Sequence, residues 1–161
     1  MKTLHLLRHA KSDWSHPGQD DHDRTLNQRG KRARNLVAKH VAGWNVDLVV
    51  CSTARRARET AEPVIEALGC AVRYDAALYA ATAERLLTVV CALPDEHDSV
   101  LLVGHNPSME ELAEMLSGES VEYPTAALGT LALGVEHWSD VAPGCGTVTA
   151  FTTPKELDAS R

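Results

Sequence analysis

The chain has 161 residues, which suffices for one domain that buries its own hydrophobic core. Its formal net charge is −6 and 4% of its residues are aromatic, which argues against a nucleic-acid-binding surface because such surfaces are basic. No stretch approaches the roughly 18 consecutive apolar residues of a membrane helix. The N-terminus leads directly into a strand, without the apolar segment of a signal peptide, and the four cysteines form no C-x-x-C pair. We therefore expect a cytoplasmic protein with reduced thiols that binds neither nucleic acid nor membranes.

Short apolar runs bounded by turn residues predict six strands, at 2–8, 46–51, 71–74, 99–103, 130–135 and 147–152. Apolar residues at three- and four-residue spacing predict helices at 26–42, 54–68, 82–93 and 106–117. In the fourth helix Asn106 is expected to be the N-cap, with Pro107 in the first turn. Pro63 falls inside the second helix and allows a kink there.

The alternation of strands and helices predicts an α/β protein, a three-layer α/β/α sandwich with a mostly parallel sheet. The last two strands fit antiparallel strands at one edge of that sheet. Residues 1–153 are expected to form a single domain, and residues 154–161 a polar, frayed C-terminal tail.

Two of the predicted strands end in a histidine, namely His9 after the run 4–8 and His105 after the run 100–104. A third strand ends before the arginine-rich segment 52–58. Ligands of such sheets bind outside the carboxyl ends of the strands, so Arg8, His9, His105 and an arginine of this segment are expected to meet. A neutral imidazole can attack phosphorus, and the guanidinium fork of arginine matches phosphate oxygens. The pattern therefore predicts a phosphoryl site with a histidine nucleophile.

Five segments carry the motifs, in chain order: Leu-Leu-Arg-His-Ala-Lys-Ser at 6–12, Asp-Arg-Thr-Leu-Asn-Gln-Arg-Gly at 23–30, Cys-Ser-x-x-x-Arg-Ala-x-x-Thr at 51–60, Leu-Tyr at 78–79 and Val-Gly-His-Asn-Pro at 103–107. In this order they resemble the histidine phosphatase (phosphoglycerate mutase-like) superfamily, and within it the small SixA-type phosphohistidine phosphatases. The resemblance implies the phosphoglycerate mutase-like fold. It further implies His9 as the nucleophile and a phosphate pocket of Arg8, Arg56 and His105. The serine-x-x-x-arginine-alanine spacing selects Arg56 over its neighbour Arg55, which is expected at the surface.

Two positions depart from the family's pattern. Ala10 stands where the superfamily usually has glycine, and alanine is small enough to keep the close backbone approach. Ala80 stands two residues after Leu78, where mutases and many phosphatases of the superfamily carry a glutamate that donates a proton. A leaving imidazole needs that proton less than an alkoxide does, because its conjugate acid has a pKa of about 6.5. The second departure therefore favours phosphohistidine over phosphoglycerate as the substrate.

Four further residues are candidates for contacts with the substrate: Lys11, Ser12, Arg24 and Asn106. For Arg24, an ion pair with Asp21 or Asp23 is an equally good interpretation. The acidic cluster at 20–23 lacks the spacing of a calcium-binding loop and is expected to be solvated. Neither a metal nor a cofactor is expected.

Spacing excludes other phosphate chemistries. Arg56 lies one residue too close to Cys51 for the C-x5-R loop of a cysteine phosphatase, and the phosphate-binding motif G-x-x-x-x-G-K-[ST] is absent. The sequence thus predicts a metal-independent phosphatase with a covalent phosphohistidine intermediate, acting on phosphohistidine in a protein. Two alternatives stay open, a small-molecule phosphomonoesterase of the same superfamily and an inactive module that binds phosphate or phosphohistidine. The partner is accordingly a phosphorylated protein or a small phosphoester, and the oligomeric state stays open, a monomer being compatible with the sequence.

Overall fold

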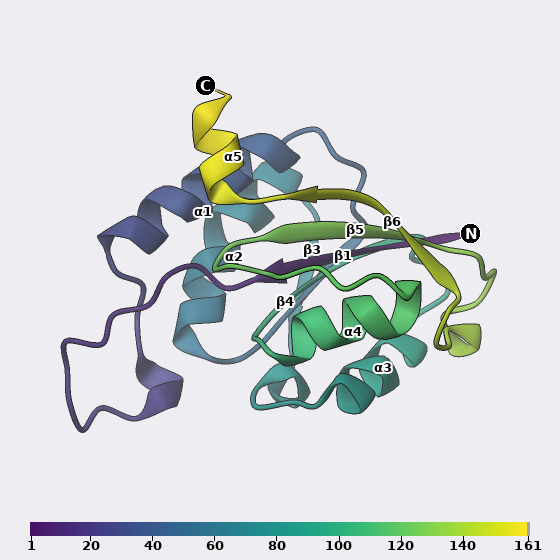
Figure 1. Cartoon of the computed structure of the whole chain (residues 1–161), viewed down its shortest axis with the longest axis horizontal. Coiled ribbons are helices and arrows are strands. Elements are labelled where there is room, and N and C mark those ends of the chain that lie inside the picture. Colours follow the sequence, from purple (N-terminus) through teal and green to yellow (C-terminus); the bar gives the residue numbers. More distant parts are fainter. Residues whose placement is uncertain (161) are drawn as a thin grey trace.

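The computed structural model describes residues 1–160, and Arg161 lies outside the described residues. A six-stranded sheet in the order β3-β2-β4-β1-β5-β6 forms the middle layer (Figure 1). Its strands are β1 (Lys2–Arg8), β2 (Leu48–Cys51), β3 (Ala71–Tyr74), β4 (Ser99–Gly104), β5 (Leu128–Leu133) and β6 (Gly146–Thr152). Strands β3, β2, β4 and β1 are parallel, whereas β5 and β6 pair antiparallel. The predicted class, a mostly parallel α/β sheet with antiparallel edge strands, is confirmed.

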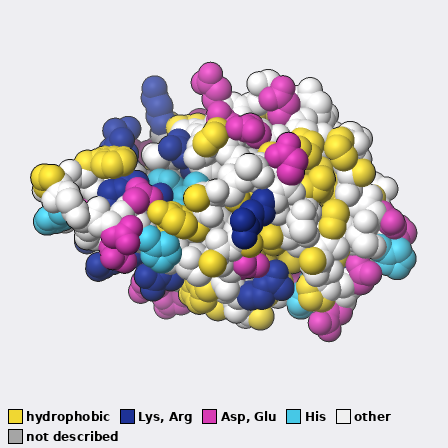
Figure 2. Space-filling view, turned by 90° about the horizontal axis from the view of Figure 1, so that it is seen from below, with side chains coloured by type: hydrophobic (Ala, Val, Ile, Leu, Met, Phe, Trp, Pro, Cys, Tyr) yellow, Lys and Arg dark blue, Asp and Glu magenta, His cyan; other side chains and the backbone are white. Residues whose placement is uncertain are grey.

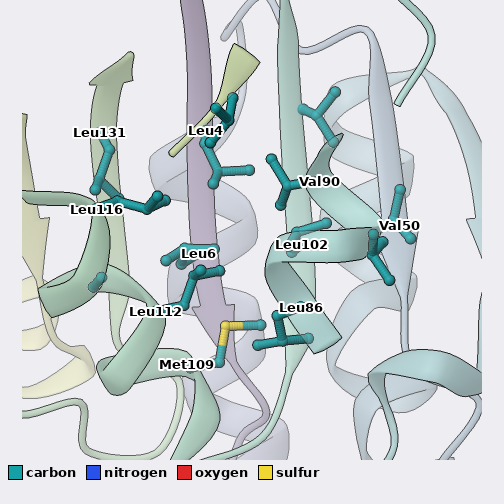
Figure 3. Close-up of a cluster of buried hydrophobic side chains, with 14 of the residues drawn as sticks. Leu4, Leu6, Val50, Leu86, Val90, Leu102, Met109, Leu112, Leu116 and Leu131 are labelled. Carbon is teal, nitrogen blue, oxygen red and sulfur yellow. The ribbon is translucent and has the colours of Figure 1, made fainter. Parts of the chain in front are cut away.

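Helices cover both faces of the sheet, and these are α1 (Gln28–Val41), α2 (Arg55–Leu68), α3 (Ala83–Cys91), α4 (Ser108–Ser117) and α5 (Pro154–Ala159). Side chains of α3 and α4 pack on one face, where Leu86 and Met109 meet Leu6 and Leu102 of the sheet (Figure 3). Side chains of α1, α2 and α5 pack on the opposite face in a second apolar cluster. Pro63 lies inside α2, which runs through it as one helix.

The central strands β1 and β4 are buried on both faces, which explains why their sequences are continuous apolar runs rather than alternating ones. Their register pairs Arg8 with Gly104, and β2 pairs Cys51 with Val103 of β4. The three strands therefore end at the same level of the sheet. The residues that follow them, at positions 9, 52 and 105, leave the sheet side by side.

The expectation of a frayed C-terminal tail is wrong for the described residues. Residues 154–159 form helix α5, whose N-terminus is capped by Thr153, since its hydroxyl accepts the N–H of Glu156. Leu157 packs against the apolar cluster under α1. The cap and this apolar contact hold the short helix against the rest of the domain. In Figure 1 helix α5 stands beside α1.

The expected N-cap at Asn106 is also wrong. Helix α4 begins at Ser108 after a cis Asn106–Pro107 peptide bond, and Pro107 occupies the cap position. The Asn106 side chain instead donates to Glu110 Oε2 at 3.1 Å and to the Tyr123 carbonyl at 2.9 Å. These longer-range partners outweigh the local capping preference.

His5 is a buried histidine with a structural role. Its Nδ1 lies 2.8 Å from the Thr130 hydroxyl and its Nε2 lies 3.4 Å from the Ser99 hydroxyl, so the ring bridges β5 and β4. The ring packs 4.9 Å from the Trp44 ring. Burial lowers the pKa of His5 to about 4.

We expect this buried ring to make folding sensitive to acid. The unfolded chain holds His5 at a pKa of about 6.5 and therefore binds its proton first, so the stability present above that pH is lost as the pH falls. Between pH 7 and pH 5 this group should cost about 2 kcal/mol of unfolding free energy. Urea denaturation at both pH values should show a smaller loss in His5→Gln than in the wild type. Equal losses in the two proteins would contradict the assignment.

Candidate active site

The chain leaves β1 at His9, whose ring is held in one tautomer. Its backbone N–H donates to the Gly104 carbonyl at 2.9 Å, which extends the pairing with β4 by one residue. Its Nδ1 lies 2.7 Å from the carbonyl oxygen of Ala10. Because a carbonyl only accepts, Nδ1 must carry the proton. The lone pair is then on Nε2, the atom that faces Arg56.

The His9 ring is neutral at physiological pH. Burial lowers its pKa, the hydrogen bond to Ala10 opposes this, and the neighbouring His105, Arg56 and Arg8 lower it further, to about 3. Desolvation disfavours imidazolium, and nearby cations add to that effect. A buried ring with its lone pair free of a proton is a competent nucleophile toward an electrophilic phosphorus.

Helix α2 is tied to the His9 loop by Thr60. Its hydroxyl accepts the Ala10 N–H at 2.9 Å and donates to the Arg56 carbonyl at 2.7 Å. Arg56 itself donates from Nε toward His9 Nε2 at 3.4 Å. The arginine and the nucleophilic nitrogen are thus positioned by the same short network.

His105 follows β4 and faces His9, with the two ring centroids 5.1 Å apart. Its Nε2 lies 2.8 Å from the Ser52 hydroxyl, which also accepts the Ala54 N–H. A serine hydroxyl that accepts from Ala54 has its own proton to donate, so Ser52 can donate to Nε2 and leave the proton of His105 on Nδ1. Nδ1 is buried and has no hydrogen-bond partner among the described residues. A buried donor of this kind is satisfied by an anionic ligand.

Arg8 completes the group of cations. Its Nη1 donates to the Tyr123 carbonyl at 2.9 Å, and its buried Nε has no partner among the described residues. Burial lowers the pKa of Arg8, and the negative charge of Glu110 opposes that shift. Glu110 also accepts from Asn106, so the amide nitrogen of Asn106, a predicted substrate contact, is committed to holding this wall together.

Asp21 belongs to the site, although the acidic cluster at 20–23 was expected to be only a solvated loop. It lies in the turn Asp21–Asp23, and its carboxylate accepts from Arg56 at 3.1 Å, Tyr79 at 2.7 Å and Arg24 at 3.0 Å. Burial pushes its pKa upward, but the hydrogen bonds from Tyr79 and Arg24 and the charge of Arg56 lower it to about 2. Asp21 is therefore a permanent anion that clamps two arginines.

The remaining predicted contacts divide into two groups. Arg24 is buried and donates to the Ser12 hydroxyl, and its guanidinium lies 3.6 Å from the centre of the Trp14 ring. The two predicted contacts Arg24 and Ser12 therefore lie together in the loop beside the site. The ion pair with Asp21 that was the alternative for Arg24 is also present. Lys11 is exposed and its side chain lines a separate groove between α1 and α5.

Arg55 and Cys51 lie near the phosphate pocket in the sequence, but neither side chain belongs to it. Arg55 is half exposed and pairs with Glu59. Burial raises the pKa of the Cys51 thiol to about 12, which makes it a poor nucleophile. Within residues 1–160, no group of three or more His, Cys, Asp or Glu is arranged to hold a metal, and no helix is long and apolar enough to cross a membrane.

The sequence did not predict three residues of this site, namely Asp21, Tyr79 and Ser52. Ser52 and Tyr79 belong to the motifs at 51–60 and 78–79 but had no predicted role, and Asp21 lies two residues before the motif at 23–30. Figure 2 shows Lys, Arg and His side chains, with Asp and Glu side chains among them, at the end of the molecule that carries the 9–27 loop. A small anion such as a phosphoryl group suits this end electrostatically.

The protonation of His9 can be measured directly. The imidazole signals of His9, assigned by comparison with His9→Gln, should show a neutral ring with the proton on Nδ1 from pH 8 down to about pH 4. Nitrogen-15 NMR during an acid titration reads both the tautomer and the midpoint. A midpoint near the ordinary pKa of about 6.5, or a proton on Nε2, would contradict the geometry.

Comparison with known proteins identifies the family of the chain. A family model described as histidine phosphatase superfamily (branch 1) matches residues 4–80. The uncharacterized protein Rv1276c of Mycobacterium tuberculosis is 35% identical over 92% of this chain and 100% of its own length. The structure of a candidate phosphohistidine phosphatase SixA from Agrobacterium tumefaciens superposes with a TM-score of 0.83 at 32% identity, covering 95% of this chain and 98% of that one. A mycobacterial glucosyl-3-phosphoglycerate phosphatase, Rv2419c, shares the fold at 19% identity and a TM-score of 0.72, over 95% of this chain and all of its own. The chain belongs to the histidine phosphatase superfamily and resembles its SixA type along nearly its whole length.

Proposed function

We propose that this protein is a phosphatase that removes the phosphoryl group from phosphohistidine in another protein. His9 Nε2 attacks phosphorus and forms a P–N bond while the P–N bond to the substrate's ring breaks. The substrate's ring carries a proton on its other nitrogen, so it leaves as neutral imidazole. Water then attacks the phosphorus of phospho-His9, releasing inorganic phosphate and regenerating the neutral ring. Arg8, Arg56 and His105 stabilise the charge on the three equatorial oxygens, so the reaction proceeds without a metal.

The observation that carries the choice of substrate is the protonation state of the groups around His9. Asp21 has a pKa of about 2, and burial, with the charge of Arg56, lowers that of His105 to about 4. Tyr79 directs its hydroxyl to Asp21, which raises the pKa of Tyr79. Position 80, where many relatives carry a glutamate, is Ala80. None of these groups is a carboxylic acid that is protonated near pH 7.

A substrate with a good leaving group suits this site best. General acid catalysis typically contributes about 10²–10⁴-fold when the leaving group is an alkoxide. The imidazole that leaves phosphohistidine has a conjugate acid with a pKa of about 6.5 and needs far less help. The likeness to a candidate SixA supports the same choice, whereas the more distant likeness to a glucosyl-3-phosphoglycerate phosphatase supports only the shared fold.

The proposal predicts a substrate preference. A histidine-containing carrier protein, phosphorylated chemically with phosphoramidate, should release phosphate faster than 3-phosphoglycerate by at least about the 10²-fold that an acid would contribute. An aryl phosphate should also turn over, because its leaving group is stable as an anion. Phosphate release is measured with EDTA present, and His9→Ala should abolish it for all three substrates.

Each contrary result has a distinct meaning for this proposal. Activity of His9→Ala equal to that of the wild type would overturn the nucleophile. Equal or faster turnover of 3-phosphoglycerate would overturn the choice of substrate and point to a small phosphoester. Binding of phosphate without any turnover would indicate the inactive module.

Adjacent arginines offer a matched test of the phosphate pocket. Arg56→Lys should slow formation of phospho-His9 by about 10²–10³-fold, because one ammonium cannot replace a guanidinium that both contacts the oxygens and pairs with Asp21. Arg55→Lys, one residue away and paired with the exposed side of Glu59 at the surface, should stay within about twofold. Rapid quenching with an aryl phosphate reads the covalent intermediate. Similar losses in both variants would remove Arg56 from the pocket.

A further inference from the structure

A second feature lies outside the phosphate site, a basic groove between α1, α5 and residues 124–125. It encloses about 1100 Å³. Five cationic side chains line it: Lys11, Arg29, Arg32, Lys39 and Lys155. Asp158 is the one carboxylate among the described residues of its lining. We call it the α1–α5 groove.

The cations of the α1–α5 groove outnumber the acidic side chains in the part of its lining that the structure describes. Within the described residues, none of the five makes a hydrogen bond or an ion pair through its side chain, whereas Arg34 and Arg55 nearby both lie against glutamates. Residues 24–46 carry six of the chain's sixteen Lys and Arg and none of its 22 Asp and Glu. Three of these six, Arg29, Arg32 and Lys39, line the groove beside Lys11 and Lys155, and this local positive charge in a protein of net charge −6 favours an acidic ligand.

The groove adjoins the phosphate site through a shared segment. Tyr123 accepts from Arg8, and the Ala126 N–H donates to the His9 carbonyl at 3.0 Å. Pro124 and Thr125, between those two residues, line the α1–α5 groove. A ligand in the groove would therefore lie beside the loop that holds the nucleophile.

The chemistry of the lining favours a protein segment over a nucleic acid. Between the cations lie Ala33, Leu36, Pro124 and Pro154, which offer an apolar floor. No aromatic side chain is among the described lining residues, so bases would find no stacking platform. An amphipathic segment with acidic residues beside apolar ones matches both the floor and the rim.

We propose that the α1–α5 groove binds an acidic amphipathic segment of the phosphorylated protein and so presents its phosphohistidine to His9. This inference rests on the proposed function in naming the substrate protein as the ligand. Binding itself needs no turnover, so it can be tested separately from catalysis.

The binding test uses a fluorescein-labelled synthetic peptide with glutamates along one helical face and leucines and alanines along the other. In fluorescence anisotropy at low salt it should bind the wild type, and Arg32→Glu/Lys39→Glu should weaken binding by about tenfold or more. The matched control is Lys31→Glu/Arg85→Glu, which changes the net charge equally at exposed positions that do not line the groove. It should weaken binding clearly less than the groove variant does, because neither of its positions contacts a ligand held in the groove.

The kinetic test uses the same peptide extended by one histidine, phosphorylated with phosphoramidate. The groove variant should raise KM by about tenfold and leave kcat unchanged, while both double variants hydrolyse an aryl phosphate as the wild type does. High salt should remove the difference, since the Debye length falls from about 30 Å at about 0.01 M to about 3 Å at about 1 M.

Three results would overturn the inference: no binding of the peptide, equal weakening by the groove variant and its control, or tighter binding of an oligothymidylate than of the peptide. A scrambled peptide of the same composition that binds equally well would also overturn it, because it would reduce the groove to a surface for any polyanion. Failure of the proposed phosphatase activity would give a different result from failure of the proposed groove. In that case the peptide would bind through the groove, but no substrate would lose its phosphate in a manner dependent on His9.

Discussion

The hydrogen bond between His9 Nδ1 and the Ala10 carbonyl is the contact on which the rest of the site depends. It leaves the lone pair on Nε2, beside Arg56. The ring can stay neutral among guanidinium groups because it is buried, and the same cations that prevent its protonation are placed to bind phosphate oxygens. In the proposed mechanism, one arrangement therefore serves both the activation of the nucleophile and the binding of its target.

Asp21 resolves the problem that this arrangement creates when no ligand is bound. Arginines gathered in a buried crevice repel one another, and a fixed carboxylate that pairs with Arg56 and Arg24 offsets that repulsion. Asp21 is itself half exposed, and its hydrogen bond from Tyr79 keeps it oriented. A phosphoryl group that enters the crevice brings a second anion to the same guanidinium groups, so the pairing of Asp21 with Arg56 sets how strongly the pocket holds phosphate.

The parts of the site that follow strand ends were predictable, and the parts that come from loops were not. His9 and His105 could be placed together because parallel neighbours in one register end at the same edge, whatever the intervening chain does. Asp21 comes from a turn whose sequence also fits a solvated surface, and only the folded loop brings it to Arg56. The prediction that Asn106 caps helix α4 was wrong for a related reason. Capping is a local preference, whereas the side-chain amide of Asn106 donates to Glu110 and to the Tyr123 carbonyl, 4 and 17 residues away. The bond to the Tyr123 carbonyl is long-range and leaves no periodicity to detect.

Charge distribution links the two halves of the functional proposal. Because residues 24–46 are free of acidic side chains, the acidic excess of the chain lies elsewhere, and the positive charge along α1 favours an approaching anion. A free phosphoester would be attracted to the phosphate pocket alone. The cations of the α1–α5 groove pair with no other side chain among the described residues, and Pro124 and Thr125 of the same groove belong to the segment that contacts Arg8 and His9. A ligand that fills this groove and also reaches His9 must be larger than a free phosphoester, which favours a protein as the substrate.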